Sequence, residues 1–586
     1  MSSIYSMGAV PKWLFSFPTW QHPQTLGYNS RTKAICRRRY ESIPPLEVLC
    51  RVRWRRGRRL KASRAQKDPS TNTDTSIETS ALNQKETKEN VDNLYTGFLQ
   101  NIRNTFKTDE LGWEISLLVF PAIVSLAAEP IASLVDTAFV GHIGPVELAA
   151  VGVSISIFNI VSKLFNIPLL NVTTSFVAEE ASRDFGEKVI INQAYDRQSK
   201  NYTRGHWSLE DKDKLQETLA EGNNRLQLPA VSTALVLAAG LGVVEAVVLT
   251  LGAGYLLNFM GVPVDSPMRL PAEQYLSLRA LGAPGTVVSL AVQGVFRGFK
   301  DTKTPLYATG AGNILNTLLD PIAMFTLGFG ISGAAVTTAL SEYFIAFMLL
   351  WNLNKEMDLL PSNMEELRFD RYVKSGGLLL GRTVAILVTM TLGTSMAARQ
   401  GAIAMAAHQI CIQVWLAVSL LTDSLALAGQ ALVASAVAKK DYKKAKVVAF
   451  RILKIGLGCG LASALILFVG FTHFSKLFTN DTAVFEIMTS GVLFVAGTQP
   501  LNALAFVFDG LHYGVSDFAY ATYSMIVVGT ISSVWLVVAP SSLGLGGVWI
   551  GLGLFMGLRM VAGFLRLGAK SGPWYFLRQD MEESDI

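Results

Sequence analysis

The chain has 586 residues, of which 50% are hydrophobic and 16% are charged, and its formal net charge is +6. About a quarter of the residues in a soluble domain are charged. The apolar runs that fill this chain after residue 110 are too long for an outer-membrane barrel, and they lack the alternation of barrel strands. The composition therefore excludes an ordinary soluble protein and predicts an all-α polytopic membrane protein.

The net charge of the first 66 residues is more positive than that of the whole chain. They contain fourteen Lys and Arg residues against two acids, Glu41 and Glu47, so the remainder nets −6. The basic stretches 37–40 and 51–61 could bind nucleic acid or anionic lipid, but an Arg-rich, Ser-containing, acid-poor N-terminus is typical of organelle transit peptides. We predict a chloroplast transit peptide over 1–66; a mitochondrial one and a permanent basic tail are the alternatives.

Residues 67–110 form a polar segment, which we predict to be a flexible linker. Twelve apolar segments long enough to span a bilayer follow it. The even-numbered connections between them hold twenty-one Lys and Arg residues and the odd-numbered ones hold three, so the positive-inside rule places the even connections and both termini on one side. The predicted spans are 114–140, 147–180, 229–256, 272–296, 305–327, 331–353, 372–397, 402–437, 444–470, 484–511, 517–539 and 544–568.

The two halves of the chain repeat one another. GISGAAV at 330–336 recurs as GLGGVWI at 544–550. Three residues that shape the backbone recur at one fixed offset: Pro284, Gly294 and Asp301 in the first half, and Pro500, Gly510 and Asp517 in the second. With an even number of spans in each half, the halves have the same orientation. We therefore predict two pseudo-symmetric six-helix lobes around a central cavity.

The predicted domain boundaries follow from this duplication. The N-lobe covers 111–353 and includes an unusually long, charged loop, 183–228, which we interpret as a solvated excursion. The segment 354–371 links the lobes, the C-lobe covers 372–568, and a C-terminal tail covers 569–586.

Two carboxylates lie in the first predicted span. Glu129 and Asp136 are seven residues apart, which is two helical turns, so both lie on one helix face. A carboxylate in hydrocarbon costs about 2.5–3.5 kcal/mol on insertion scales, so it is retained where it faces a cavity, binds a cation or carries a proton. A position at the water interface, or hydrogen bonds to neighbouring helices, is the alternative. The pair indicates transport.

A second polar group is predicted on the fifth and sixth spans. Asn316 and Asp320 are four residues apart and share a helix face, and the sixth span contributes Thr337 and Thr338. Together with Asp136 they could form one buried cluster that exchanges protons, since burial disfavours a charged carboxylate. An interhelical hydrogen bond is the alternative role for Asn316, and simple packing is the alternative for Thr338.

The C-lobe has both signs of charge inside its predicted spans. Asp423 lies in the eighth span, Asp509 in the tenth, Arg382 in the seventh and Arg559 in the twelfth. A buried arginine needs an anionic partner. Arg382 either pairs with Asp509 or Asp423 in a structural role, or it meets an anionic substrate in the cavity.

The sequence shows no catalytic constellation. The four histidines in or near the spans lack HExxH spacing, and no phosphate-binding loop for ATP is present. The four cysteines form neither a disulfide framework nor a metal-binding pattern. We predict a transporter and not an enzyme, with no cofactor and no metal site, driven by an ion gradient or passive.

Several motifs together resemble the multidrug and toxic compound extrusion (MATE) family. The resemblance extends over about residues 111–568, and it is greatest to the plant detoxification branch that includes citrate exporters. It implies twelve helices in two lobes and cation-coupled efflux of organic solutes. The motifs are PIASLVDTAFVGHIGPVELAAVGVS, VAEE, VFRGFKDTKTP, NTLLDPIAMF, GISGAAVTTAL, SMAARQG and FVFDG.

The resemblance also implies site residues. Asp136, Asn316, Asp320 and Thr338 match the family's N-lobe cation site, and Asp509 matches the tenth-helix acid of the C-lobe. Drug-exporting members often carry a glutamate in the seventh helix, where this chain has Arg382 in LLLGRTVAI. This departure argues against a C-lobe cation site and favours an anionic substrate. Glu129, Asp423, Asp509 and Arg382 are therefore candidates for additional coupling or for substrate binding.

The predicted function is cation-coupled efflux of an organic solute, such as the anion citrate, across a chloroplast envelope membrane, with the inner membrane favoured. Proton antiport is the expected mechanism: protonation of Asp136 and Asp320 would bend or shift the first helix around Pro121 and Pro130. The alternatives are a sodium-coupled exporter of neutral or cationic metabolites and a passive organic-anion channel. The expected partners are the solute, protons or sodium, and the lipid bilayer, without nucleic acid, and the chain is expected to act as a monomer.

Overall fold

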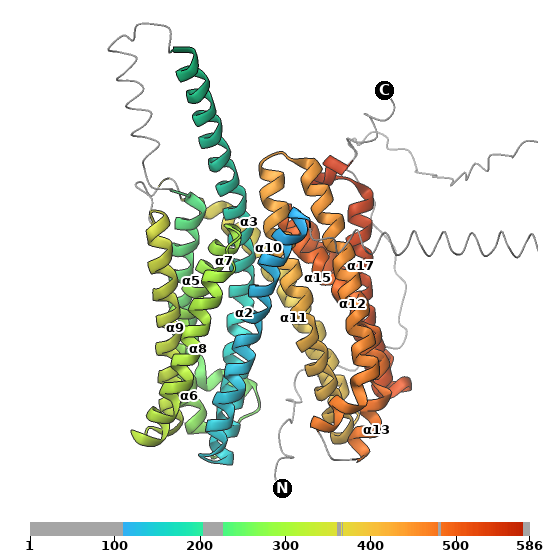
Figure 1. Ribbon diagram of the computed structural model, residues 1–586. Helices are drawn as coiled ribbons and strands as arrows, with labels where there is room; N and C mark the ends of the chain where they lie inside the picture. Colours follow the sequence, from blue (N-terminus) through green and yellow to red (C-terminus); the bar gives the residue numbers. More distant parts are fainter. Residues whose placement is uncertain (1–108, 203–226, 360–364, 366, 479–481, 578–586) are drawn as a thin grey trace, which may run out of the picture. The chain divides into compact units, whose positions relative to one another are not determined.

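The structure, a computed structural model, describes residues 109–202, 227–359, 365, 367–478 and 482–577 (Figure 1). The predicted transit peptide, and the predicted linker up to residue 108, lie outside the described residues. The described elements of regular structure are all helices: α2 (Glu110–Gly141), α3 (Pro145–Tyr202), α5 (Pro229–Phe259), α6 (Arg269–Ala280), α7 (Ala283–Gly298), α8 (Lys303–Pro321), the π-helix η2 (Ile322–Thr326), α9 (Gly330–Glu356), α10 (Phe369–Ala398), α11 (Ala402–Ala438), α12 (Tyr442–Phe478), α13 (Thr482–Ser490), α14 (Val492–Gly497), α15 (Gln499–Gly514), α16 (Phe518–Val538), α17 (Pro540–Ala569) and the 3-10 helix η4 (Gly572–Leu577).

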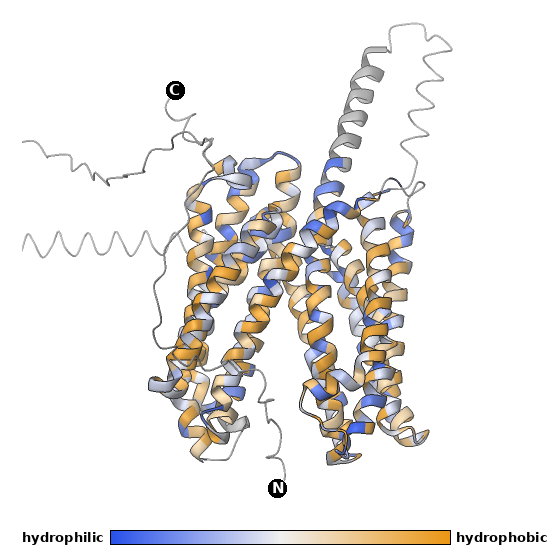
Figure 2. Cartoon of the chain, turned by 180° about the vertical axis from the view of Figure 1, so that it is seen from behind, coloured by the Kyte–Doolittle hydropathy of each residue, from blue (hydrophilic) through white to orange (hydrophobic). Residues whose placement is uncertain are grey.

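The described helices agree with a polytopic membrane protein. Nine of them are long and apolar enough to cross a membrane, and two bent helix pairs bring the number up to 11. The remaining predicted span, 305–327, corresponds to α8 and η2, where Asn313, Asn316 and Asp320 reduce the hydropathy. Hydrophobic residues predominate along the middle of the helices, and hydrophilic residues gather toward several helix ends (Figure 2).

One predicted boundary differs from the structure. The second span was expected over 147–180, but helix α3 continues to Tyr202 and so enters the predicted loop 183–228. Residues 183–202 contain no proline, and no pair of glycines, that would end a helix. Charged residues are compatible with a helix that has left the apolar region. Residues 203–226 of this loop lie outside the described residues.

The two bent pairs occupy equivalent places in the repeat. α6 and α7 meet at 46°, and the α13–α14 segment meets α15 at 43°. Pro284 and Pro500 lie at the start of the second helix of each pair. Each proline contacts a glycine of a neighbouring helix: a Cβ on Gly242 would lie 2.6 Å from the Cα of Pro284, and one on Gly460 would lie 2.8 Å from the Cα of Pro500. Both glycines are therefore required for close helix packing.

Two turns are also duplicated. Lys300 and Ser516 have positive φ angles of 62° and 56°, and in each case the next residue, an aspartate, donates its N–H to the carbonyl five residues back at 2.8 Å. Gly330 and Gly544, which begin the repeated GISGAAV and GLGGVWI segments, both have φ of 55°. A positive φ angle costs glycine little free energy because glycine has no Cβ atom. This explains why glycine occupies both positions.

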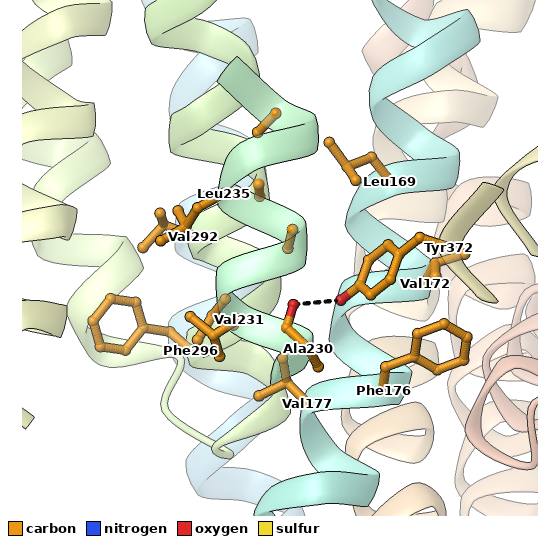
Figure 3. Close-up of a cluster of buried hydrophobic side chains, with 14 of the residues drawn as sticks. Leu169, Val172, Phe176, Val177, Ala230, Val231, Leu235, Val292, Phe296 and Tyr372 are labelled. Atoms are coloured by element: carbon orange, nitrogen blue, oxygen red, sulfur yellow. Dashed lines mark hydrogen bonds between the residues drawn. The ribbon is translucent and has the colours of Figure 1, made fainter. Parts of the chain in front are cut away.

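The helices pack in two sets, α2–α9 and α10–α17, and each set contacts mainly its own members. Tyr372 of α10 crosses between them: its hydroxyl donates to the carbonyl of Ala230 (2.9 Å), and its ring packs edge-on against Phe176 with centroids 5.1 Å apart (Figure 3). The surrounding core is formed by Leu169, Val172, Val177, Val231, Leu235, Val292 and Phe296. Apolar packing therefore joins the two sets through α3 and α10.

Polar contacts join the two sets at the helix ends that lead into the basic connections. Glu114 of α2 accepts hydrogen bonds from the amino groups of Lys300 (2.9 Å) and Lys444 (3.2 Å), which belong to different sets. The hydroxyl of Ser182 on α3 donates to that of Ser435 on α11 at 2.9 Å. Helix α2 packs against α8 in its own set and against α11 in the other, so it contacts both halves of the molecule.

Candidate functional site

The predicted N-lobe residues meet where α2, α8 and α9 pack together. Asp136 on α2 and Asp320 on α8 bring their carboxyl groups within hydrogen-bonding reach of one another. Asp320 is fully buried and accepts hydrogen bonds from Asn316 Nδ2 (3.1 Å) and from the hydroxyl of Thr337. Oδ1 of Asp136 and Oδ2 of Asp320 are buried and receive no hydrogen bond from a protein donor. Two carboxyl groups in this arrangement need a proton or a cation between them.

The local helix geometry sets these contacts. The four-residue spacing places Asn316 one turn before Asp320 on the same face of α8. Pro321 then ends α8, and the chain continues as the π-helix η2, a wider form that is frequent at functional sites. On α9 it is Thr337 that contacts Asp320, whereas the predicted Thr338 donates to the carbonyl of Ala334 on its own helix at 2.7 Å.

An arginine that the sequence analysis did not assign lies beside this cluster. Arg279 of α6 interacts electrostatically with Asp136, Asp320 and Glu342, and Glu342 in turn interacts with Glu129 of α2. The Nε of Arg279 is buried without a hydrogen-bond partner, and its guanidinium stacks over the Phe158 ring at 4.7 Å. The sequence signal for this interaction was a basic residue inside the predicted fourth span, because a buried arginine needs nearby acids.

A further buried acid, Glu245 of α5, was also missed. It is 2% exposed and accepts a hydrogen bond from the Ser162 hydroxyl of α3 at 3.1 Å, and Asn166 lies within hydrogen-bonding reach. Its Oε1 atom and both polar atoms of Asn166 lack a hydrogen-bond partner. Its partners are thus uncharged side chains, and the hydrogen bond joins α3 to α5. An acid in the middle of the third predicted span was the signal.

The C-lobe has one carboxylate between two guanidinium groups. Arg382 of α10 and Arg559 of α17 both donate through Nη2 to the same atom, Oδ2 of Asp509 on α15. Both arginine side chains are almost completely buried, at 6% and 7% exposure, against 18% for Asp509. The structural pairing of Arg382 with Asp509, which was one of the two alternatives, is present in the structure. The sequence analysis assigned no partner to Arg559.

Asp423 lies on α11 in a separate pairing. It interacts electrostatically most strongly with Arg297 of α7 and also with Asp509 and Arg559. Arg297 is 9% exposed and belongs to the other helix set. The five groups comprise three arginines and two aspartates, so their sum is +1 when both aspartates are ionised. The C-lobe's own four groups sum to zero, and the excess comes from Arg297 at the end of α7, where the chain enters a basic connection.

The described residues contain no group of three or more His, Cys, Asp or Glu side chains that could hold a metal ion. His408 is buried and contacts the indole Nε1 of Trp549 at 3.3 Å, without an acidic partner. The candidate sites are therefore the acidic N-lobe cluster (Asp136, Asp320, Glu342 and Glu129 with Arg279) and the arginine pair of the C-lobe (Arg382 and Arg559 with Asp509).

Comparisons with known proteins give a consistent result. Residues 121–181, 219–322 and 382–539 match the MatE family model. The Arabidopsis thaliana protein DETOXIFICATION 44, chloroplastic, is 56% identical over 471 residues, which is 80% of this chain and 84% of that protein. DETOXIFICATION 42 from the same organism is 47% identical over 496 residues, or 82% of this chain and 96% of that protein.

Solved structures share the fold. A crystal structure of MATE in the bent conformation has a TM-score of 0.67 at 19% identity. The match covers 80% of this chain and 97% of the chain in that structure. The outward-facing conformation of a multidrug resistance MATE family transporter of the MOP superfamily has a TM-score of 0.63 at 20% identity, with coverage of 80% and 98%.

Proposed function

Because the chain belongs to the MATE family of membrane transporters, we propose that it exports an organic anion in exchange for protons. The contact between Asp136 and Asp320 is the observation that carries the coupling. Two carboxyl groups so close repel one another when both are ionised. Loss of the shared proton would therefore push α2 and α8 apart, and uptake of a proton would draw them together again.

The same contact favours a proton over sodium as the coupling ion. Carboxyl groups within hydrogen-bonding reach leave room for a proton between them, but a metal cation needs space for its own coordination shell. Arg279 already supplies a fixed positive charge beside Asp136 and Asp320. A sodium ion at this position would meet that charge, whereas a proton neutralises one carboxylate without adding a second cation.

The substrate class follows from the C-lobe. Arg382 and Arg559 present two guanidinium groups to one carboxylate, and the whole charged group sums to +1. This polarity suits an anion and disfavours cationic drugs. We propose citrate as the first substrate to test, since it carries several carboxylates that can form the paired hydrogen bonds preferred by arginine.

We place this activity in the chloroplast envelope, in its inner membrane. The relatives DETOXIFICATION 44 and DETOXIFICATION 45 are named chloroplastic, and the first 66 residues have the composition of a transit peptide. The basic even-numbered connections would face the stroma. The predicted lobes 111–353 and 372–568 would alternate access to the cavity between them, within a single monomer.

The decisive experiment uses proteoliposomes loaded with radiolabelled citrate and an imposed pH gradient. We expect wild-type citrate flux to follow the pH gradient and the flux of Asp136→Asn and Asp320→Asn to lose that dependence. Asp301→Asn is a matched control, because that carboxylate caps a turn by accepting the N–H of Lys303 at 2.8 Å.

Three results would contradict parts of the proposal. Gradient-coupled flux in both variants would remove the N-lobe cluster from the coupling step. A response to a sodium gradient and not to pH would establish the sodium-coupled alternative. Citrate flux that ignores both gradients would indicate a passive channel, and proton-driven movement of another solute alone would leave the coupling intact and discard citrate.

A further inference from the structure

The arrangement around Asp509 is unusual because two guanidinium groups use a single oxygen atom. Arg382 and Arg559 both donate to Oδ2, and neither forms a hydrogen bond with Oδ1. Arginine recognises a carboxylate best through two parallel hydrogen bonds, one to each oxygen. Asp509 therefore satisfies each arginine only partly.

The remaining donors of both arginines are largely unused. A guanidinium group has five N–H donors, yet the Nε atoms of Arg382 and Arg559 are buried without any hydrogen-bond partner. Among the described residues, one other hydrogen bond involves these guanidinium groups: Arg559 Nη1 donates weakly to the sulfur of Met556 at 3.0 Å. Buried donors without acceptors cost free energy, so the pair is incomplete as it stands.

Aromatic rings and a small cavity border the pair. Arg382 lies over the ring of Tyr513, and Arg559 lies between Phe506 and Phe555, each at 5.4 Å from the ring centroid. Asp509 and Arg559 also line a small cavity together with Phe508, His512, Ala521, Ser524, Met525, Val528, Ala562 and Gly563. Asp509 and one of its two arginines therefore border an open space.

A second ion pair in the same lobe shows what a complete pairing looks like. Arg566 of α17 binds Asp517 through Nε to Oδ2 (2.7 Å) and through Nη2 to Oδ1 (3.1 Å), which is the two-oxygen geometry with one cation for one anion. Asp509 is one anion for two cations. The contrast indicates that the Arg382–Arg559 pair has capacity for one more carboxylate.

We propose that Arg382 and Arg559 bind one carboxylate group of the exported anion, and that Asp509 competes with it for the same N–H donors. This assignment rests on the proposed function for its substrate class. In the empty protein Asp509 keeps part of the arginine charge neutral. The bound carboxylate group adds one negative charge to the +1 sum of Arg382, Arg559 and Asp509 and neutralises it, with no covalent step and no proton transfer. Asp509 then limits the affinity and favours release.

The test measures binding without any gradient, by thermal unfolding of the purified full chain in detergent at fixed pH, titrated with citrate or with acetate. In Asp509→Asn the competing charge is gone, so we expect a lower Tm without ligand and an apparent citrate affinity about tenfold tighter than that of wild type. Citrate should then raise the Tm of the variant more than that of wild type. Asp517→Asn, which removes the other carboxylate, should leave the citrate affinity at its wild-type value.

A second variant keeps the test informative if Asp509→Asn does not fold. Arg559→Gln leaves a balanced pair, Arg382 with Asp509, and it should lose the citrate-induced rise in Tm. The assignment is overturned if Arg559→Gln keeps the wild-type rise, or if Asp509→Asn binds citrate no more tightly than wild type. These two criteria apply where citrate raises the Tm of wild type. If citrate has no effect on wild type, an acetate effect that depends on Arg559 keeps the carboxylate site and discards only citrate, and no effect of either ligand overturns the assignment.

Discussion

The two lobes have matching backbones but different interior charges. Pro284 and Pro500, Gly242 and Gly460, and the left-handed turns before Asp301 and Asp517 occupy equivalent places and have equivalent geometry. In the N-lobe, however, Arg279 interacts with three acids, Asp136, Asp320 and Glu342, whereas in the C-lobe two arginines share one acid. The duplicated residues are those that set helix packing and turns, so a lobe can change the balance of charges at its site without changing its fold.

The largest predicted effect tests the charge difference directly. Asp509→Ala removes the carboxylate to which two buried guanidinium groups donate and should lower the free energy of unfolding by about 3–5 kcal/mol. Asp320→Ala removes one acid from a cluster that keeps three others, and it should cost about 1–3 kcal/mol through its lost hydrogen bonds. Denaturant unfolding in detergent measures both values. Equal losses would mean that the two interiors do not differ in the way described.

The next prediction concerns what the lobes share. Gly242→Ala and Gly460→Ala each place a methyl group against a proline backbone, and overpacking of this kind costs about 1–3 kcal/mol. The two losses should be similar because the contacts are equivalent. Gly240→Ala is the control, since a Cβ there meets nothing within 4 Å. A large loss at only one of the two prolines would show that the duplication does not extend to packing energetics.

Glu245 sharpens the comparison within the N-lobe, because it is an acid with neutral partners only. Glu245→Gln keeps a carbonyl oxygen for the Ser162 hydroxyl and should change the unfolding free energy by less than about 1 kcal/mol. Glu245→Leu leaves the Ser162 hydroxyl without its partner and should cost about 1–3 kcal/mol. If the amide variant were as unstable as the leucine variant, the negative charge itself would be required.

The smallest effect is expected outside the membrane, where charge contributes little. The hydrogen bond from Arg451, together with the N–H of Gly112, holds the pKa of Asp109 below its ordinary value of 3.8. A lowered carboxyl pKa adds stability above the ordinary value and loses it as the pH falls through the lowered one. Asp109→Asn, which retains a good N-cap, should lower the Tm slightly at pH 7 and have no effect at a pH below the lowered pKa. A difference that persists in acid would exclude the ion pair as its cause.

Sequence periodicity predicted a large part of this molecule. The apolar runs predicted the helices, and the four-residue spacing of Asn316 and Asp320 predicted their contact. Periodicity could not decide between Thr337 and Thr338, because adjacent residues differ by 100° around a helix and the rotation of α9 depends on its packing. Nor could it assign Arg279 or Arg559, whose acidic neighbours lie on other helices and far away in sequence.

Helix α2 connects the coupling cluster to the opposite end of the molecule. Asp136 lies 22 residues after Glu114, which is roughly 33 Å along a continuous helix, and Glu114 holds lysines from both helix sets. A displacement at one end therefore reaches the other through a single backbone. Pro121 and Pro130 lie between the two ends and interrupt its hydrogen bonds. If the proposed proton coupling holds, a proton leak without substrate would require α2 to bend at these prolines while Glu114 stays in place. The stiffness of this one helix would then determine how tightly proton flux and substrate flux are coupled.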